Sequence, residues 1–392
     1  MKKAFRYRFY PTDEQRQTLA QTFGCVRVVW NWALRLRTDA FTQRKESIGY
    51  RALSSLLTQR KQEPDKDWLK DVSSVPLQQT LRHQQRAFEN FFAKRANSPR
   101  FKRKSARQAA EYTTSAFRWD GQQLRLAKMS EPLHVVWSRP LEGKPTTVTV
   151  SKDAAGRYFV SILCEVTDPK PLPVTPRMVG LDLGLTDVLV ASDGFKSGAP
   201  KFHRRRLAQL RRAQKSFSRK RRGSKNREKA RLRVARVHAR IADARCDFTH
   251  QLSTRLIQEN QLIAVESLSA RNMVQAKTLA ASIHDAAWGE LLRQLEYKAA
   301  RHGRTLVRID RWFPSSKRCS SCGFVHASMP LSVRRWRCPE CGLSQDRDVN
   351  AAVNILAAGL AVNACGGDVR PGRPMGLGSP EIPSSRGKEA GT

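Results

Sequence analysis

The sequence predicts an α/β protein whose first half is a small β-barrel interrupted by a helical block. Residues 4–10 alternate aromatic and basic side chains, the period-two pattern of a half-buried strand. Residues 12–95 then carry apolar side chains at helical spacing, and short β-rich runs follow. Because the first strand stands alone before the helices, we expect it to pair with the later strands. From residue 178 strands alternate with helices, which is typical of an α/β sheet.

The helical block begins directly after the first strand. Pro11 ends that strand, and Thr12 with Gln15 resembles a capping box at a helix start. Apolar side chains then recur at helical spacing in two runs, Leu19, Phe23, Val26 and Trp30, and later Leu77, Leu81, Phe88 and Phe92. We therefore expect packed helices between Thr12 and Arg95, followed by a basic loop at residues 98–104.

The β-rich runs at residues 134–137, 147–150 and 158–163 are expected to complete the barrel. Residues 153–156 have the composition of a tight turn and separate the second run from the third, so these two runs should form a hairpin. The proline-rich residues 168–173 are typical of a linker to the second half.

The second half combines strands and helices. Strands are expected at residues 178–185, 188–192, 262–266 and 305–309, with the first two paired. Packed helices are expected around residues 248–256 and at 288–303 and 349–360. From Gly366 to the end, 11 of 27 residues are Gly or Pro and no periodicity remains, so we expect a disordered tail.

Basic residues dominate the composition. Lys and Arg number 72 against 34 Asp and Glu, a formal net charge of +38. Such an excess repels itself in a compact chain and is usually neutralised by a polyanion, most often nucleic acid. A membrane-surface protein is the alternative, although no single helix is basic and amphipathic enough to suggest it. No stretch approaches the roughly 20 apolar residues of a membrane span, and a hydrophobic fraction of 40% excludes a wholly disordered chain.

The most basic segment is Lys201–Arg240, which holds 18 Lys or Arg and one acidic residue, Glu228. Its apolar residues are too sparse for a buried helix. We therefore expect a long solvated helical hairpin that lies against phosphate groups. A plain solvated basic face is the alternative for any single side chain in it.

Four cysteines form the pattern Cys319-x2-Cys322-x15-Cys338-x2-Cys341. The chain begins with charged residues and shows no apolar signal-peptide core, so its cysteines should stay reduced. Two Cys-x-x-Cys pairs can converge on one tetrahedral Zn²⁺, and four thiolates leave no open coordination position. We expect one structural zinc ion here. The scattered cysteines are expected to be inert thiols: Cys25, Cys164, Cys246 and Cys365.

Three carboxylates occupy unusual positions. Asp182 interrupts an apolar strand, Glu266 ends a buried strand, and Asp348 stands where the last helix should begin. A buried carboxylate needs a counter-charge, and three of them around two divalent ions could hold a scissile phosphate and lower the pKa of an attacking water. Each alone has an ordinary explanation, respectively a turn residue, a rim charge or an N-cap. The order of the three along the chain is what favours a metal site.

With the cysteine pattern lying between Glu266 and Asp348, the chain resembles TnpB, the family of transposon-encoded RNA-guided DNA endonucleases related to the compact type V CRISPR effectors. The matching segments are residues 180–184, 265–268, 313–323 and 346–352, together with Phe9-Tyr10-Pro11-Thr12, Phe23-Gly24-Cys25 and Trp30-Asn31 near the N-terminus. The resemblance covers about residues 1–365.

The resemblance implies an RNase H-like RuvC nuclease domain with an inserted zinc ribbon, and a wedge β-barrel interrupted by a helical recognition domain. The implied boundaries are 1–11 and 101–172 for the wedge barrel, 12–100 for the recognition domain, 173–314 and 346–365 for the nuclease, and 315–345 for the ribbon, before a tail at 366–392. Asp182, Glu266 and Asp348 match the family's metal-binding triad, which implies two Mg²⁺ ions besides one structural Zn²⁺.

The resemblance also implies partners. A guide RNA from the transposon end would pair with one strand of double-stranded target DNA, while the protein contacts the backbone and a short flanking DNA motif. Four residues fall where the family reads that motif, although ordinary surface roles are an equal alternative: Tyr50, Ser74, Gln78 and Thr80. The expected RNA-binding residues are Arg100, Lys102, Arg103, Lys104, Arg204, Arg205, Arg211 and Arg212. A monomeric ribonucleoprotein in the prokaryotic cytoplasm, with the nucleoid and without a membrane partner, is implied.

Two other functions compete with this interpretation. A nuclease-inactive RNA-guided repressor would bind DNA without cutting it, and the intact acidic triad argues against it. A DNA-joining transposase would need a nucleophile of its own, and none of the 6 Tyr residues lies in a His-hydrophobe-His setting.

Overall fold

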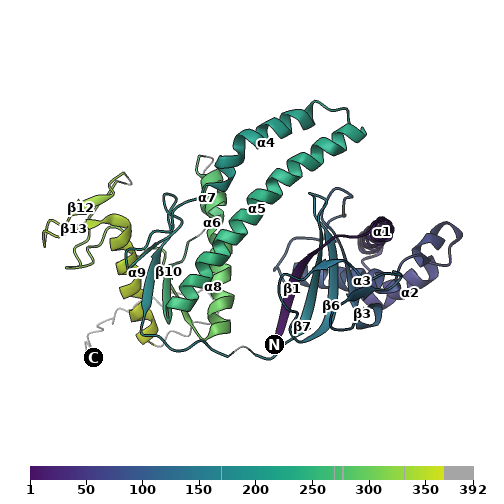
Figure 1. Cartoon of the computed structure of the whole chain (residues 1–392), viewed down its shortest axis with the longest axis horizontal. Coiled ribbons are helices and arrows are strands. Elements are labelled where there is room, and N and C mark those ends of the chain that lie inside the picture. Colours follow the sequence, from purple (N-terminus) through teal and green to yellow (C-terminus); the bar gives the residue numbers. More distant parts are fainter. Residues whose placement is uncertain (169, 269, 276–277, 331, 366–392) are drawn as a thin grey trace, which may run out of the picture. The chain divides into compact units, whose positions relative to one another are not determined.

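The computed structural model describes residues 1–168, 170–268, 270–275, 278–330 and 332–365 (Figure 1). The tail expected to be disordered, residues 366–392, lies outside the described residues. The chain divides into two compact units, Met1–Pro169 with Arg206–Ala242, and Lys170–Arg205 with Asp243–Thr392. Among the described helices, none combines the length and apolar character that crossing a membrane requires.

A five-stranded antiparallel sheet is the centre of the first unit. It consists of β1 Lys2–Phe9, β2 Gln108–Thr113, β5 Val135–Val136, β6 Lys144–Lys152 and β7 Tyr158–Glu165, in the order β2-β6-β7-β1-β5. β1 pairs along its whole length with β7, from Lys2 opposite Glu165 to Phe9 opposite Tyr158. The N-terminal strand therefore pairs with strands that follow the helical block, as expected. The order has two ends, β2 and β5, and closure into a barrel stays a prediction.

Alternation of side chains in β1 decides which face of this sheet is buried. Phe5, Tyr7 and Phe9 are at most 1% exposed. The basic residues between them point to the opposite face, where the Arg6 guanidinium stacks 3.8 Å from the centre of the Phe159 ring. The expected hairpin of β6 and β7 is confirmed by their antiparallel register.

Three α-helices form the helical block: α1 Asp13–Arg44, α2 Tyr50–Arg60 and α3 Ser74–Phe92, with a 3₁₀ helix at Pro64–Lys70. The expected capping box is present, because the side-chain oxygens of Thr12 and Gln15 each accept a hydrogen bond of 3.2 Å from the other residue's backbone N–H. Leu19, Leu77 and Leu81 are fully buried and belong to the same core as the sheet. The helices thus bury their apolar faces against the strands.

Three strands of the first unit are not predicted by the sequence pattern. They are β2 and a separate hairpin of β3 Phe117–Trp119 with β4 Leu124–Leu126. Strands of three residues are too short to establish a period of two. In β2 the consecutive Ala109 and Ala110 weaken the alternation of large and polar side chains.

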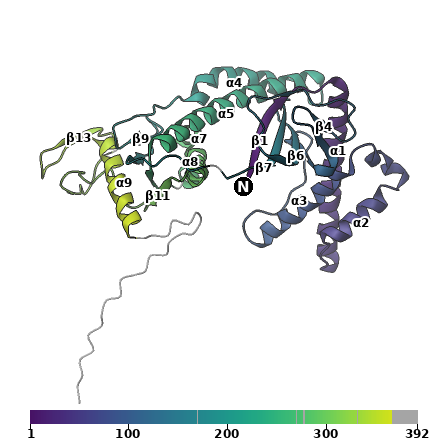
Figure 2. The ribbon, with the colours of Figure 1, turned by 60° about the horizontal axis from the view of Figure 1, so that its bottom comes forward.

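The basic segment forms two helices, α4 Phe202–Ser218 and α5 Lys225–Glu259, joined by a short turn (Figures 1 and 2). Arg227 closes that turn, since its Nη1 donates to the backbone oxygens of Phe217 (3.2 Å) and Lys220 (2.7 Å). The expected hairpin is confirmed. The packed helix expected around residues 248–256 is confirmed as the last part of α5, which continues from the basic segment without a break; residues 225–259 contain neither Gly nor Pro to end a helix.

A four-stranded sheet is the centre of the second unit. Its order is β11-β10-β8-β9, in which β8 Met178–Asp182, β10 Leu262–Glu266 and β11 Thr305–Ile309 run parallel and β9 Val190–Ala191 is antiparallel to β8. These strands lie where the sequence places them. The helices of this unit after α5 are α6 Ala270–Met273, α7 Ala280–Ala286, α8 Trp288–His302 and α9 Arg347–Ala364.

α9 packs directly against this sheet because two glycines permit a close approach. A Cβ atom at Gly180 would lie 2.1 Å from the backbone oxygen of Ala352, and one at Gly359 would lie 2.4 Å from the Cβ of Ala264. Neither separation is possible for a real side chain. The glycines therefore fix α9 over β8 and β10 and set its first turn near the end of β8.

Candidate functional site

Asp182 and Glu266 are neighbours at the carboxyl edge of the sheet in the second unit. Each is the last residue of its strand, β8 or β10. The two strands are parallel with Val265 opposite Leu181, so the next position in the register sets Glu266 beside Asp182. Paired positions of adjacent strands direct their side chains to the same face. Ligands commonly bind at this edge of a parallel sheet.

Asp348 reaches the same edge from the first turn of α9. It lies one helical turn before Ala352, which contacts Gly180, and Gly180 shares a face of β8 with Asp182 because side-chain directions alternate. Asp346 is the N-cap, since its Oδ1 accepts hydrogen bonds from the backbone N–H groups of Asp348 (3.0 Å) and Val349 (3.1 Å). The N-cap explanation for Asp348 is therefore wrong.

Electrostatics connect the three acids. Burial and the negative charges of Glu266 and Asp348 raise the pKa of Asp182 from 3.8 to about 7, although Arg347 and Arg334 oppose the shift. Burial also raises the pKa of Glu266, against the effect of a short hydrogen bond donated by the Ser315 hydroxyl. The neighbouring arginines thus balance the carboxylate charge only in part.

This cluster fits divalent cations. Carboxylate oxygens are the ligands that Mg²⁺ prefers, and a bound cation would balance the remaining negative charge. The described groups whose ligand atoms all lie within 4.8 Å of one another do not include the three acids. Two ions about 3.5–4 Å apart would need ligands spread more widely than a single ion does.

Further side chains organise the cluster without being predicted. Arg334 pairs with Asp348, with Nη1 3.3 Å from Oδ2. Asn350 accepts a hydrogen bond from the backbone N–H of Ser320 (2.8 Å) and donates to the backbone oxygen of Arg318 (2.7 Å). Asn350 and Ser315 lie in the motifs that suggested the family, so the sequence could have indicated them as part of the site. Arg334 lies outside those motifs, and nothing distinguishes it from the many other arginines of the sequence.

The four predicted zinc ligands converge at one point, with all four Sγ atoms within 4.8 Å of one another. The Sγ atoms of Cys319 and Cys341 are 3.7 Å apart, and those of Cys322 and Cys338 are 3.5 Å apart. Strands β12 Arg335–Arg337 and β13 Ser344–Asp346 carry the second Cys-x-x-Cys turn between them. Four converging thiols are the ligand set of a structural zinc ion.

Glycines shape the two cysteine turns. Gly323 and Gly342 have φ values of 82° and 72°, which favour glycine over any other residue. Their N–H groups donate to the backbone oxygens of Cys319 (3.0 Å) and Cys338 (2.9 Å). Each loop therefore folds back so that its two sulfur atoms face the same point.

The residues predicted to read DNA lie in α2 and α3. Tyr50 and Gln78 interact through a hydrogen bond of 3.3 Å from the Tyr50 hydroxyl to Gln78 Oε1, and Arg82 Nε donates to the same hydroxyl at 3.1 Å. Ser74 is exposed at the start of α3. Thr80 is buried and its hydroxyl donates to the backbone oxygen of Pro76, so in this structure it is not accessible to a base.

The basic loop at residues 98–104 is hydrogen-bonded to α1. Trp30 Nε1 donates to the backbone oxygen of Arg100 at 3.0 Å. Asn31 binds the backbone of Lys102 twice, at 2.7 Å and 3.1 Å, and the Lys102 ammonium lies 4.1 Å from the centre of the Trp30 ring. The side chains expected to contact RNA are exposed, here and on α4: Arg100, Lys102, Arg103, Lys104, Arg204, Arg205, Arg211 and Arg212.

Family models match three segments of the chain. One is described as a helix-turn-helix domain (residues 1–46), one as "Probable transposase" (161–277) and one as "Cas12f1-like, TNB domain" (288–355). In the structure residues 1–46 contain β1 and the single helix α1, rather than two helices joined by a turn.

Similar proteins match almost the whole chain. A Streptomyces pristinaespiralis protein named "Putative RNA-guided DNA endonuclease" is 57% identical over 95% of this chain and 93% of its own length. An Escherichia coli K12 protein with a name of the same kind is 33% identical over 95% of this chain and 96% of its own. The solved structure of a Cas12f1–sgRNA–target DNA complex matches 91% of this chain and 98% of its own with a TM-score of 0.53 at 11% identity, a likeness of fold. On the strength of the two full-length sequence matches, the chain belongs to the TnpB family.

Proposed function

We propose that this chain is an RNA-guided endonuclease that cuts double-stranded DNA with Mg²⁺ at Asp182, Glu266 and Asp348. The observation that carries the proposal is the meeting of these three acids at the carboxyl edge of one parallel sheet, where burial and the charges of Glu266 and Asp348 raise the pKa of Asp182 to about 7. The names of the full-length relatives support RNA guidance and DNA as the substrate.

In this proposal the three acids share one task. Asp182, Glu266 and Asp348 would together hold two Mg²⁺ ions. Bound there, Mg²⁺ supplies Lewis acidity toward the scissile phosphate and lowers the pKa of an attacking water. Ser315 orients Glu266 through its hydroxyl, and Arg334 holds Asp348.

The sheet of the second unit agrees with a RuvC-type nuclease domain. We propose residues 173–314 and 346–365 for this domain, with the zinc ribbon of residues 315–345 inserted between Glu266 and Asp348. One Zn²⁺ on Cys319, Cys322, Cys338 and Cys341 would have a structural role, since four thiolates leave no position for a substrate.

The first unit is proposed to hold the nucleic acid. Residues 1–11 and 101–172 would form the wedge barrel and residues 12–100 the helical recognition domain. Exposed arginines and lysines of the basic loop and of α4, whose residues up to Arg205 belong to the second unit, would contact the guide RNA. Tyr50, Ser74 and Gln78 remain candidates for reading the flanking DNA motif, since a glutamine amide suits an adenine edge, whereas the buried Thr80 would support α3.

The decisive test uses the purified protein with the RNA that copurifies with it. Sequencing that RNA identifies the guide, and a duplex that matches it should be cut with Mg²⁺ and left intact without it. Asp182→Ala should bind the RNA as the wild type does and cut nothing. Cutting by Asp182→Ala would remove Asp182 from the metal site.

The same experiment separates the alternatives. A wild-type protein that retains guide RNA and binds the matched duplex without cutting it would be a nuclease-inactive repressor. Joined rather than cut DNA ends would indicate a transposase. Light scattering of the loaded particle tests the further proposal that one protein chain binds one RNA, and cell fractionation tests association with the nucleoid.

A further inference from the structure

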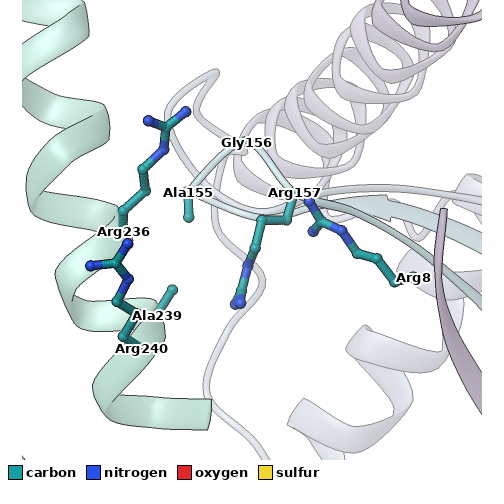
Figure 3. Close-up of a pocket in the computed structure, with 7 residues that line it drawn as sticks. All are labelled: Arg8, Ala155, Gly156, Arg157, Arg236, Ala239 and Arg240. Atoms are coloured by element: carbon teal, nitrogen blue, oxygen red, sulfur yellow. The ribbon is translucent and has the colours of Figure 1, made fainter. Parts of the chain in front are cut away.

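The first unit contains a pocket that none of the predicted site residues line. Its volume is about 270 Å³, and three parts of the fold contribute to it: Arg8 from β1, Ala155, Gly156 and Arg157 from the β6–β7 turn, and Arg236, Ala239 and Arg240 from α5 (Figure 3). Pockets for small-molecule cofactors usually measure about 300–1,000 Å³ and are mainly apolar. This pocket is smaller, and four of its seven lining residues are arginines.

Arg8 presents a donor that lacks a partner. Its guanidinium is held between aromatic rings, 5.2 Å from the centre of Tyr10 and 5.1 Å from the centre of Phe159. Its Nη1 atom is buried and makes no hydrogen bond to any described residue. A buried donor without an acceptor is unfavourable. A ligand that brings an acceptor into the pocket would therefore be stabilised there.

The α5 side of the pocket adds two more guanidinium groups. Arg236 and Arg240 lie four residues apart on one face of the helix and are exposed, and neither forms an ion pair with a carboxylate among the described residues. Like charges at this spacing repel each other. An anion bound between these two arginines and Arg8 on β1 would offset that repulsion.

Contacts between α5 and the β6–β7 turn fix the pocket's width. The Arg231 Nη1 lies 3.5 Å from the backbone oxygen of Ala154. A Cβ at Gly156 would lie 3.4 Å from Leu232 Cδ1, and the φ of +79° at Gly156 favours glycine. Arg157, the fourth arginine, forms an ion pair with Asp153 that stabilises the turn. The other three arginines are therefore the main hydrogen-bond donors to an anion in the pocket.

We propose that this pocket binds one backbone phosphate of a nucleic-acid strand, so that the strand bridges α5 and the sheet. Several guanidinium groups can surround a tetrahedral phosphate with charge-assisted hydrogen bonds. The inference rests on the proposed function, since guide RNA or target DNA would supply the phosphate. It adds Arg8, which lies outside the basic segment Lys201–Arg240, to the phosphate-binding residues, and it places Arg236 and Arg240 of that segment at the same phosphate.

The test replaces both α5 arginines in the full chain, as Arg236→Gln with Arg240→Gln. The matched control is Lys229→Gln with Arg233→Gln, which removes the same charge from the same helix two turns earlier, at exposed positions outside the pocket. Affinity is measured over a series of KCl concentrations for the RNA recovered from the wild-type complex, for a matched DNA duplex, and for inorganic phosphate as a competitor.

Loss of one phosphate contact should weaken binding roughly tenfold in the pocket variant and lower the salt slope by about 1. Ethylation interference gives the specific readout. In the wild type, ethylation of one particular phosphate should block binding, and in the pocket variant that single signal should disappear while signals elsewhere remain. The control pair should retain it. Arg8→Lys, which keeps the charge and loses the planar donor set, should weaken the same signal.

The position of the lost signal identifies the source of the phosphate. A signal in the RNA assigns the pocket to the guide, and a signal in the duplex assigns it to target DNA. An identical interference pattern in the pocket variant and the wild type would overturn the inference. It would also be overturned if the pocket bound inorganic phosphate but no phosphate of an RNA or DNA strand. If the wild type still cuts a matched duplex in that case, the proposed function survives; a wild type that retains no nucleic acid would end both.

Discussion

Replacing Asp182 with asparagine should stabilise the magnesium-free protein while abolishing DNA cutting. The acid is held in a site that opposes its ionisation, because it is largely buried and faces the charges of Glu266 and Asp348. Asparagine has nearly the same shape and carries no charge. The substitution therefore removes the repulsion and keeps the packing of β8 against α9.

The size and pH dependence follow from the shift in pKa. A rise from 3.8 in the unfolded chain to about 7 in the folded one corresponds to about 4 kcal/mol. This is an upper limit, since the side chain retains some exposure to solvent. Below pH 4 the acid is neutral in both states and costs nothing. Between pH 4 and 7 the folded state binds more protons, so the stability of the wild type falls as pH rises, and above pH 7 the full cost remains.

Urea unfolding of the second unit at pH 4.5 and pH 8 measures the effect, in buffer freed of magnesium by dialysis so that no chelator removes zinc. Asp182→Asn should be more stable than the wild type by at most about 1 kcal/mol at the lower pH and by up to about 4 kcal/mol at the higher one. Mg²⁺ at pH 8 should stabilise the wild type much more than the variant. The control is Asp193→Asn, an exposed acid in the same unit. Equal stability of wild type and Asp182→Asn at pH 8 would refute the reasoning.

Three further changes test other parts of the structure. Gly180→Ala should destabilise the second unit by about 3 kcal/mol in urea unfolding, because its Cβ would overlap the backbone oxygen of Ala352; an unchanged midpoint would contradict this packing. Cys338→Ser should lose the bound zinc measured by elemental analysis and reduce solubility, while Cys365→Ser, outside the cluster, should keep one zinc per chain. Asn31→Ala removes two hydrogen bonds to Lys102 and should speed tryptic cleavage within residues 100–104; cleavage at the wild-type rate would show that Asn31 does not restrain the loop.

The fold could be predicted where a sequence pattern repeats often enough to identify its period. β1 alternates buried aromatic and basic side chains from Phe5 to Phe9, and its pairing with later strands follows from its isolation before the helices. β3 and β4 have three residues each, and their existence depends on the surrounding core more than on their own pattern. The sequence pattern also did not predict that α5 continues unbroken from the basic segment into residues 248–256. Its composition changes from basic to apolar near residue 240, but composition changes the environment of a helix without ending it.

The three acids of the candidate site could be identified from the sequence, but the contacts that other side chains make with them could not. An acid in an apolar strand is conspicuous, so Asp182 is visible in the sequence, and order along the chain suggested its partners. The pairing of Asp348 with Arg334 depends on the fold of the intervening ribbon, which no local pattern specifies. The arginine pocket was missed because its members are separated by more than 200 residues in a chain where arginine is common.

The position of the ribbon in the chain has a structural reason. Its first residues pass through the acid cluster, where Ser315 donates to Glu266 and the backbone at Arg318 and Ser320 is bound by Asn350, two residues after Asp348. Cys319 lies within this same short stretch, and Gln345 donates to its sulfur at 3.5 Å. Four sulfur atoms on one zinc ion would fix the stretch that connects Glu266 with the start of α9. We therefore expect a zinc ion on these four thiols to limit the movement of the two acids on either side of the cluster in the sequence, Glu266 and Asp348.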